Sequence, residues 1–225
     1  GFTKAYLRDS NTELISTFRA IRDYPEEIAT RMTAYSNDSE TYYMVRASSP
    51  KERIEKAARF LFLNHTSFNG IYRVNLKVVY NVPFGNRPTP QMPTAEHLRN
   101  VATRLKDARL DHGDFATCLR KVAKGDLVFL DPPYTVAHNN NGFIKYNQKL
   151  FSFEDQKRLS KLIDEIRERG GYYILANAAH PSIAELFTRP GNSRVETSRR
   201  NAVGGLNATR GSATEYLFTN LKAPT

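Results

Sequence analysis

The sequence is poor in cysteine and contains no long apolar run, no internal repeat and no low-complexity tract. Its one cysteine, Cys118, cannot form an intrachain disulfide, and the lack of a cysteine or histidine cluster at ligand spacing predicts no metal site. A bilayer span needs about 18 apolar residues in a row, and the sequence has no such run. Residues 1–9 do not have the pattern of a signal peptide. These absences lead us to expect a cytoplasmic protein without a membrane segment.

The composition is that of a folded protein with excess positive charge. Apolar residues make up 40% and charged residues 25% of the 225 residues, which is ordinary for a folded domain. This length favours one domain with an inserted lobe, or two small domains. The 33 Lys and Arg residues against 23 Asp and Glu residues leave a net charge of +10, which suits a polyanion such as nucleic acid. A positive net charge also occurs in proteins where it serves solubility alone. The charge by itself therefore does not decide between a nucleic-acid-binding protein and a soluble protein without such a partner.

Segments of strand and helix character alternate near both ends of the chain. Residues 5–9 have the pattern of a short strand that ends in an acid, and residues 11–21 repeat apolar side chains at helical spacing. The α/β pattern resumes at 108–115. Further on, it predicts a buried strand at 127–130, a helix at 152–169 with a capping box of Ser152 and Asp155, a buried strand at 172–175, a helix at 181–187, and strands at 195–197 and 215–218.

The middle of the chain has a different character. Residues 25–106 are mainly helical in pattern and locally basic, and they show no alternation of strands and helices. Within them, residues 64–90 are polar, aromatic and rich in turn formers such as Asn69-Gly70. We therefore predict an α/β domain of residues 1–24 and 107–225 that is interrupted by a helical insertion at 25–106.

The tetrapeptide Asp131-Pro132-Pro133-Tyr134 directly follows the predicted strand at 127–130. An amine conjugated to an aromatic ring is a poor nucleophile until acceptors aimed at its hydrogens free the lone pair. The Asp131 carboxylate and the Pro132 carbonyl can supply two such acceptors, and the two prolines fix the turn that carries them. Tyr134 can stack on a base that has been flipped out of a duplex. The tetrapeptide thus favours methyl transfer to such an amine from a donor such as a sulfonium group.

Asp and Pro also form ordinary turns, so the tetrapeptide is open to a purely structural interpretation. Its place after four apolar residues favours a site, because α/β sheets bind ligands at the carboxyl ends of their strands. The same tetrapeptide also suits cytosine amines and RNA or protein amides, so it does not by itself fix the substrate.

Several further motifs occur in the order found in the Dam-like, or D12-class, DNA adenine methyltransferases, and the sequence resembles this family over nearly its whole length. The matching segments besides 131–134 are 6–11, 62–64, 68–75, 81–85, 113–115, 175–177, 198–200 and 215–217. The resemblance implies a Rossmann-like, S-adenosylmethionine-dependent methyltransferase sheet with an inserted helical target-recognition domain. It also implies transfer of a methyl group to the N6 amino group of a flipped-out adenine in double-stranded DNA. Whether a restriction enzyme is paired with the methyltransferase is left open.

The resemblance assigns roles to acids at strand ends. Asp9 resembles the acid that accepts hydrogen bonds from the ribose hydroxyls of the cofactor, and Asp114 with Phe115 resembles the pair that holds its adenine. Asp131 belongs to this cofactor site as well as to the catalytic tetrapeptide. Without the resemblance, Asp9 equally suits a helix N-terminus favoured by the dipole, Asp114 the end of a strand, and Phe115 a core position.

The segment 69–85 resembles the DNA-contacting hairpin of the family, with Arg73 placed to read a guanine edge or a phosphate. The predicted DNA-binding residues are Asn69, Arg73, Asn75, Pro83, Arg87, Lys145, Arg199 and Arg200. Taken singly, Asn69-Gly70 is also a tight turn, and each arginine also suits a solvated surface. The family typically has a glycine and an acidic residue where this chain has Val78 and Val79, which bears on the DNA sequence recognised.

The resemblance also implies two upstream pieces that cradle the methionine end of the cofactor, a Pro-Gly-Gly-Lys-like loop and a Phe-x-Gly-x-Gly turn. Neither occurs in the sequence, so we expect this segment to be supplied in the same chain or by another chain. The alternative is a DNA-binding relative of such enzymes that is catalytically silent because its cofactor site is incomplete.

Overall fold

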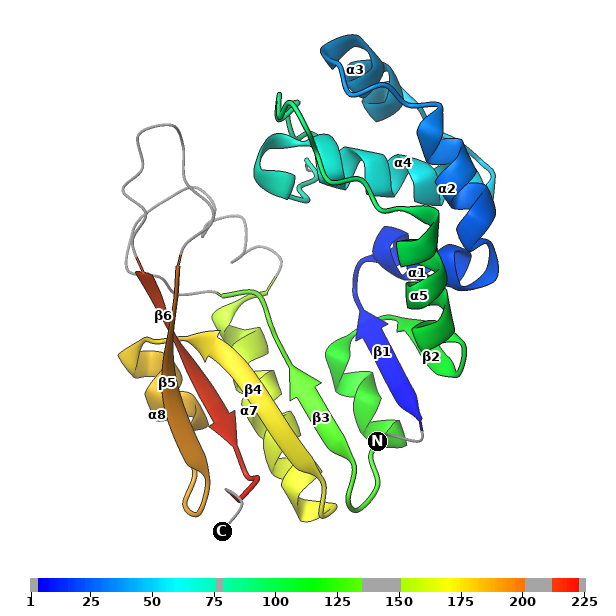
Figure 1. The fold of residues 1–225 in the computed structure, drawn as a ribbon. Helices are drawn as coiled ribbons and strands as arrows, with labels where there is room; N and C mark the ends of the chain where they lie inside the picture. The colour runs from blue at the N-terminus through cyan, green and yellow to red at the C-terminus, as the bar shows by residue number, and fades with distance from the viewer. Residues whose placement is uncertain (1–3, 76–78, 135–150, 201–211, 223–225) are drawn as a thin grey trace. The chain divides into compact units, whose positions relative to one another are not determined.

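The computed structural model describes residues 4–75, 79–134, 151–200 and 212–222, and Figure 1 shows their helices and strands. These elements in chain order are β1 (Ala5–Asp9), α1 (Thr12–Asp23), α2 (Pro25–Thr33), α3 (Ser39–Ala47), α4 (Arg53–Thr66), η1 (Phe68–Gly70), α5 (Ala95–Leu105), β2 (Ala108–His112), η2 (Phe115–Lys121), β3 (Leu127–Leu130), α7 (Phe153–Glu168), β4 (Tyr172–Ala178), α8 (Pro181–Phe187), β5 (Ser193–Arg200) and β6 (Ser212–Thr219). The chain forms two compact units, Gly1–Phe115 and Ala116–Thr225, each with its own packing.

In the first unit, α1 begins where the Asn11 side chain accepts hydrogen bonds from the backbone N–H groups of Glu13 and Leu14, at 3.0 and 3.1 Å. This cap satisfies donors that the first turn leaves unpaired and stabilises the helix by about 1 kcal/mol. α1 packs on α2, α4 and α5. The core among these helices consists of Ala20, Ile21, Ile28, Ala29, Met32, Ala57, Ala58 and Leu98. The predicted helix at 11–21 is thus confirmed.

A second core joins α3 and α4 to the segment that follows α4. Its buried residues are Tyr42, Val45, Phe62, Leu63, Tyr80 and Val82. The Tyr42 hydroxyl donates to the Val82 carbonyl at 2.9 Å. Burial raises the pKa of Tyr42 far above its ordinary value, so the phenol stays protonated and keeps donating. The segment after α4 is therefore anchored to the helices at its buried positions.

β1 and β2 form a parallel two-stranded sheet, in which Ala5 pairs with Ala108 and Asp9 with His112. α1 follows β1 directly and contacts both strands. A small core of Ile15, Leu105, Ala108 and Leu110 lies between the helices and this sheet. The predicted strand at 5–9 and the return of the α/β pattern at 108 are confirmed.

The second unit contains a four-stranded sheet in the order β3-β4-β6-β5, with β3 parallel to β4 and β6 antiparallel to both of its neighbours. α7 contacts β4 and α8, and both helices lie on the same face of the sheet (Figure 1). α7 begins with the predicted capping box, in which Ser152 Oγ accepts from the Asp155 N–H at 3.2 Å and the Asp155 carboxylate accepts from the Ser152 N–H at 2.9 Å. The second of these bonds lowers the pKa of Asp155.

The prediction of a fully buried strand at 127–130 is wrong in part, because Phe129 is 64% exposed. Side chains alternate along a strand, so Leu130 is buried on the same face as its partner Leu175, and Phe129 points to the opposite face. β3 is also the edge strand of this sheet. Four apolar residues in a row therefore do not mean burial on both faces here.

Both units combine helices with strands, so the fold is mixed α/β, as predicted. The predicted strand at 172–175 is the first part of β4, but its predicted burial is wrong for Tyr172, which is exposed. The strands predicted at 195–197 and 215–218 are the centres of β5 and β6. The grouping of residues 1–24 with 107–225 into one interrupted domain stays a prediction.

Candidate active site and DNA-binding surface

The carboxyl ends of β1 and β2 meet at one edge of their sheet, because the strands are parallel with Asp9 opposite His112. The Gly113 N–H donates to the Asp9 carbonyl at 3.0 Å, and His112 Nε2 lies 3.1 Å from the Ser10 carbonyl oxygen. Gly113 has a φ of +143°, and a Cβ there would lie 2.9 Å from Nη1 of Arg8. The loops after the two strands are thus held together, and the positive φ favours glycine where they meet, whereas the flexible end of Arg8 could move aside.

Asp9 is half-buried, and the loop after β1 orients its carboxylate. Its Oδ1 accepts a hydrogen bond from the Asn11 N–H at 2.6 Å, and Asn11 in turn caps α1. This oxygen is therefore fixed close to the positive end of the helix dipole. Oδ2 makes no hydrogen bond among the residues that the structure describes, so it is available to accept from the hydroxyl groups of a ligand.

Asp114 and Phe115 follow directly after this edge. Asp114 is exposed, and Phe115 is half-buried at the start of η2. The structure therefore brings three of the four predicted cofactor-site residues to one edge of the first unit, while the fourth, Asp131, belongs to the second unit. The sequence analysis missed His112, whose contact with Ser10 comes from a residue 102 positions away along the chain.

The tetrapeptide Asp131 to Tyr134 begins directly after β3, whose last residue, Leu130, pairs with Leu175 of β4. Because β3 and β4 are parallel, the tetrapeptide lies at the carboxyl edge of the second unit's sheet, where α/β sheets bind ligands. Asp131 and Pro133 are exposed, and Pro132 and Tyr134 are half-buried. The Asp131 side chain is accordingly accessible to a substrate at this edge.

A buried amide pair supports the same edge. Asn177, near the end of β4, is fully buried, as is Gln156 of α7. Asn177 Nδ2 donates to Gln156 Oε1 at 3.0 Å, and Asn177 Oδ1 accepts from the Ala178 N–H at 2.9 Å. Buried polar groups are costly unless they are paired, so this pair fixes α7 against the end of β4, beside the strand that carries Asp131. The sequence analysis gave Asn177 no role, because nothing in the local pattern identifies its partner.

The segment after α4 folds back on itself as an antiparallel hairpin. Its bridges pair Ser67 with Phe84 and Val74 with Tyr80. Nearer the tip, the Asn75 N–H donates to the Val79 carbonyl at 2.9 Å, and the Val79 N–H donates to Asn75 Oδ1 at 3.1 Å. Burial raises the pKa of Tyr80, whose hydroxyl donates to the Ile71 carbonyl at 3.1 Å. The hairpin is therefore fixed by its own hydrogen bonds and by a buried phenol.

Its base approaches the end of α4 very closely. The Gly85 N–H donates to the Thr66 carbonyl at 2.8 Å, and the Phe68 N–H donates to the Pro83 carbonyl at 2.9 Å. A Cβ at position 85 would lie 2.5 Å from the Ser67 carbonyl oxygen, a distance that real Cβ atoms do not show. Only glycine fits at this point of the hairpin.

Four of the predicted DNA-binding residues lie exposed on the hairpin: Asn69, Arg73, Asn75 and Pro83. Asn69 has a left-handed φ of 54°, which asparagine tolerates better than most residues. Arg73 Nε donates to Asn81 Oδ1 at 2.9 Å, and Nη2 donates to the Asn81 carbonyl at 3.3 Å. The Arg73 guanidinium is thus held in one orientation on an exposed surface.

Arg87 is exposed, but it also supports the end of α4, because its Nη2 donates to the carbonyls of His65 and Ser67 at 2.6 and 3.4 Å. Burial lowers the pKa of His65, so its imidazole is neutral at pH 7. Arg199 and Arg200 are the last two residues of β5, and the backbone there pairs with β6. The predicted phosphate contact Lys145 lies outside the described residues.

The described residues contain neither a metal site nor a membrane-spanning helix. No group of three or more His, Cys, Asp or Glu side chains there is arranged to hold a metal ion. No helix within the described part of the chain is long and apolar enough to cross a membrane.

The fold and these sites define the chain as an α/β protein whose strand ends carry acids suited to a nucleotide-like ligand. Comparison with known proteins makes this specific, because the family model of D12 class N6 adenine-specific DNA methyltransferases matches residues 1–202. The chain belongs to this family. The predicted family and the predicted activity of a DNA adenine-N6 methyltransferase are thereby confirmed.

Named relatives agree with this assignment. The chain is 31% identical to the Type II methyltransferase M1.LlaDCHI of Lactococcus lactis subsp. cremoris, over 96% of this chain and 79% of that protein. It is 32% identical to the DNA N-6-adenine-methyltransferase of Escherichia phage P1, over 96% of this chain and 29% of the relative. It is 28% identical to the DNA adenine methylase of Escherichia coli, over 78% of this chain and 65% of the relative. The chain thus spans most of the first relative and less than two thirds of the other two.

Proposed function

We propose that this chain transfers a methyl group from S-adenosylmethionine to the N6 amino group of an adenine that has been flipped out of double-stranded DNA. The observation that carries the proposal is the exposed Asp131 carboxylate directly after β3, at the carboxyl edge of a parallel strand pair, in a chain that belongs to the D12 family. α/β sheets bind ligands at this edge, and the tetrapeptide supplies the acceptors that an aromatic amine needs.

The residues at the carboxyl ends of β1 and β2 fit the adenosine part of S-adenosylmethionine. Asp9 is oriented by Asn11 and keeps one carboxylate oxygen for ribose hydroxyls. Asp114 is exposed and suits the adenine amino group, and the half-buried ring of Phe115 suits its flat face. When bound, S-adenosylmethionine supplies an electrophilic methyl carbon on a positively charged sulfur. Asp131 completes this set of residues in the proposal.

The tetrapeptide acts on the adenine amine. The Asp131 carboxylate and the Pro132 carbonyl accept its two hydrogens, which draws the lone pair of N6 out of conjugation with the ring and directs it to the methyl carbon. N6 gains one bond to carbon, and the electron pair of the broken carbon–sulfur bond stays on sulfur. The extra proton then leaves N6 for Asp131 or for water. Pro133 restricts the turn, and Tyr134 stacks on the flipped base.

The first unit supplies the DNA contacts in this proposal. Asn69, Arg73, Asn75 and Pro83 are exposed on one hairpin, and Arg73 is held in place by Asn81 as an arginine that reads a base must be. Arg87, Lys145, Arg199 and Arg200 are proposed phosphate contacts. We further propose that residues 1–24 and 107–225 form the Rossmann-like sheet and that 25–106 are its target-recognition insertion, which the helical character of α2 to α5 supports.

The test is transfer of labelled methyl from S-adenosylmethionine to unmethylated duplex DNA, followed by nucleoside analysis and mapping of the modified sites. The expected product is N6-methyladenine. Methylated cytosine, or label in RNA or protein instead, would replace adenine as the substrate. Intact DNA binding without any methylated base would favour the silent DNA-binding relative.

Asp131→Ala tests the mechanism. It removes one of the two acceptors, so we expect kcat to fall by about a thousandfold while DNA affinity stays within a factor of a few. Asp126→Ala is the matched control, because Asp126 lies at the opposite end of β3 and accepts from the Ala123 N–H at 2.9 Å. Equal activity of the two variants would remove Asp131 from the mechanism.

A further inference from the structure

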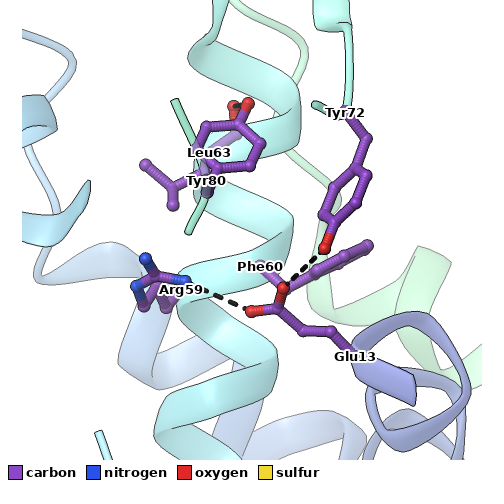
Figure 2. A pocket seen from close by; sticks show the side chains of 6 residues that line it. All are labelled: Glu13, Arg59, Phe60, Leu63, Tyr72 and Tyr80. Carbon is purple, nitrogen blue, oxygen red and sulfur yellow. Dashed lines mark hydrogen bonds and ion pairs between the residues drawn. The ribbon is translucent and has the colours of Figure 1, made fainter. Parts of the chain in front are cut away.

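Three polar side chains from distant parts of the first unit meet at one point, as Figure 2 shows. Glu13 of α1 accepts a hydrogen bond from the Tyr72 hydroxyl at 3.0 Å through one carboxylate oxygen. Its other oxygen accepts from Arg59 Nη1 of α4 at 3.2 Å. Tyr72 lies in the first arm of the hairpin, 59 positions along the chain from Glu13. The carboxylate therefore joins α1, α4 and the hairpin.

Glu13 is also tied to the proposed cofactor edge. Its backbone N–H donates to Asn11 Oδ1 at 3.0 Å, and the Asn11 N–H donates to Asp9 Oδ1 at 2.6 Å. Only two hydrogen bonds thus separate Glu13 from the carboxylate proposed to hold the ribose. A shift of Asp9 would therefore be passed through Asn11 to the first turn of α1, which carries Glu13.

On the other side, Tyr72 is tied to the proposed DNA-reading residues. Its ring packs at 5.5 Å between centroids from Phe60 of α4 and at 5.6 Å from Tyr80 of the hairpin's second arm. The next residue is Arg73, whose guanidinium binds Asn81 across the hairpin. The Tyr72 hydroxyl therefore fixes the arm of the hairpin that presents Arg73.

Arg59 holds the carboxylate in place and is largely engaged in bonds within the protein. Its Nε donates to the Val45 carbonyl at 3.1 Å and its Nη2 to the Arg46 carbonyl at 2.8 Å, while Nη1 pairs with Glu13. Only 12% of the Arg59 side chain is exposed. The space among these side chains is filled and has no room for a bound molecule. The cluster in Figure 2 therefore connects α1, α4 and the hairpin, and it is not a ligand site.

We propose that Glu13 and Tyr72 are positioning residues that couple occupancy of the cofactor edge at Asp9 to the placement of the DNA-reading hairpin. The inference rests on the proposed function, which supplies the two ligands. Bound cofactor fixes the loop of Asp9 and Asn11, and the hydrogen bond from Tyr72 to Glu13 transmits this restraint to Arg73. Each ligand then favours the arrangement that the other binds, and by linkage the effect is equal in both directions.

The experiment measures this coupling directly. The probes are S-adenosylhomocysteine, which carries no transferable methyl group, and a synthetic duplex with the sequence that the methylation assay maps. DNA affinity is measured with and without saturating S-adenosylhomocysteine, and S-adenosylhomocysteine affinity is measured with and without the duplex. For the wild-type protein we expect each ligand to raise the affinity of the other by the same factor, on the order of tenfold.

Tyr72→Phe removes only the hydroxyl and keeps the ring packing, so the fold is preserved. We expect this variant to reduce the coupling factor to about twofold or less, with little change in S-adenosylhomocysteine affinity measured alone. Glu13→Ala is the second variant, because it removes the acceptor of the Tyr72 hydroxyl altogether, and we expect the same loss of coupling. Tyr43→Phe is the matched control, because the Tyr43 hydroxyl makes no hydrogen bond among the described residues and its ring is exposed on α3.

The outcomes separate this inference from the proposed function. Unchanged coupling in Tyr72→Phe, or an equal loss in Tyr43→Phe, overturns the inference while the proposed function stands. A wild-type protein that binds both ligands without any coupling overturns it as well. With the expected upstream segment of the cofactor site supplied, a wild-type protein that fails to bind S-adenosylhomocysteine and duplex DNA refutes the proposed function, and the inference falls with it.

Discussion

Replacing Gly85 with alanine is expected to break the base of the hairpin that we propose contacts DNA. The new Cβ would lie 2.5 Å from the Ser67 carbonyl oxygen and 2.9 Å from the Thr66 carbonyl oxygen. Both are backbone atoms of buried residues, so neither can swing aside as a flexible side chain can. Relief of the clash requires the hairpin to move away from the end of α4.

The size of the effect follows from the contacts that this movement breaks. Restoring an ordinary contact of 3.4 Å from 2.5 Å takes a displacement of 0.9 Å. That displacement stretches the bond from the Gly85 N–H to the Thr66 carbonyl and the bond from the Phe68 N–H to the Pro83 carbonyl, now 2.8 and 2.9 Å. Each lost hydrogen bond costs about 1 kcal/mol, and overpacking adds about 1 to 3 kcal/mol. We expect Gly85→Ala to lower the free energy of unfolding by about 3 to 5 kcal/mol.

Urea unfolding measures this loss, and hydrogen exchange of the Asn75 and Asn81 amides reports whether the hairpin opens locally. DNA affinity should fall with it. Gly191→Ala is the matched control, since its φ is +75° and a Cβ there meets no atom within 4 Å. It should cost only the left-handed backbone penalty of about 1 kcal/mol and leave DNA affinity unchanged. A Gly85→Ala protein with wild-type stability and DNA affinity would refute the close approach described for the base of the hairpin.

Three other predictions follow from single residues. Arg73→Ala should reduce discrimination between the methylated site and altered sites by about 1 to 3 kcal/mol, measured as the ratio of kcat/KM values, and an unchanged ratio would show that Arg73 reads no base. Arg189→Ala should lower the free energy of unfolding in urea by about 2 kcal/mol. The reason is that the Arg189 guanidinium donates to both carboxylate oxygens of Asp164, at 2.8 and 3.1 Å, and its side chain is only 16% exposed. The surface control Lys157→Ala should cost under about 1 kcal/mol. Burial lowers the pKa of His65 from 6.5, so the folded protein resists its protonation and stability should fall as pH drops below this value. A His65→Gln variant with the same slope of unfolding free energy between pH 7 and 5 as the wild type would assign that slope to other groups.

The elements that the sequence predicts well are those whose signals are local. The capping box of α7 needs only Ser152 and Asp155, three positions apart, and it forms as expected. Helical spacing of apolar residues likewise places α1 within a few residues of its observed bounds. The tetrapeptide after β3 was found for the same reason, since its four residues are consecutive.

The parts that could not be predicted depend on contacts between distant residues. The buried pair of Asn177 and Gln156 and the contact of Tyr72 with Glu13 join side chains 21 and 59 positions apart, and neither partner has a sequence feature that points to the other. The exposure of Phe129 was also missed, because an apolar run does not tell which strands flank it or which face the helices cover.

The positive charge of the chain can likewise be counted from the sequence, whereas the role of each arginine depends on contacts with distant residues. Several arginines that add to the net charge of +10 donate to backbone carbonyls and thereby serve the fold, namely Arg19, Arg46, Arg59, Arg87 and Arg189. A guanidinium whose three nitrogens each donate within the protein, as in Arg59, contributes to the long-range field but has few donors left for a phosphate. Net charge therefore favours attraction of a polyanion, whereas Arg73, exposed and oriented by Asn81, is the residue that we propose distinguishes one DNA sequence from another.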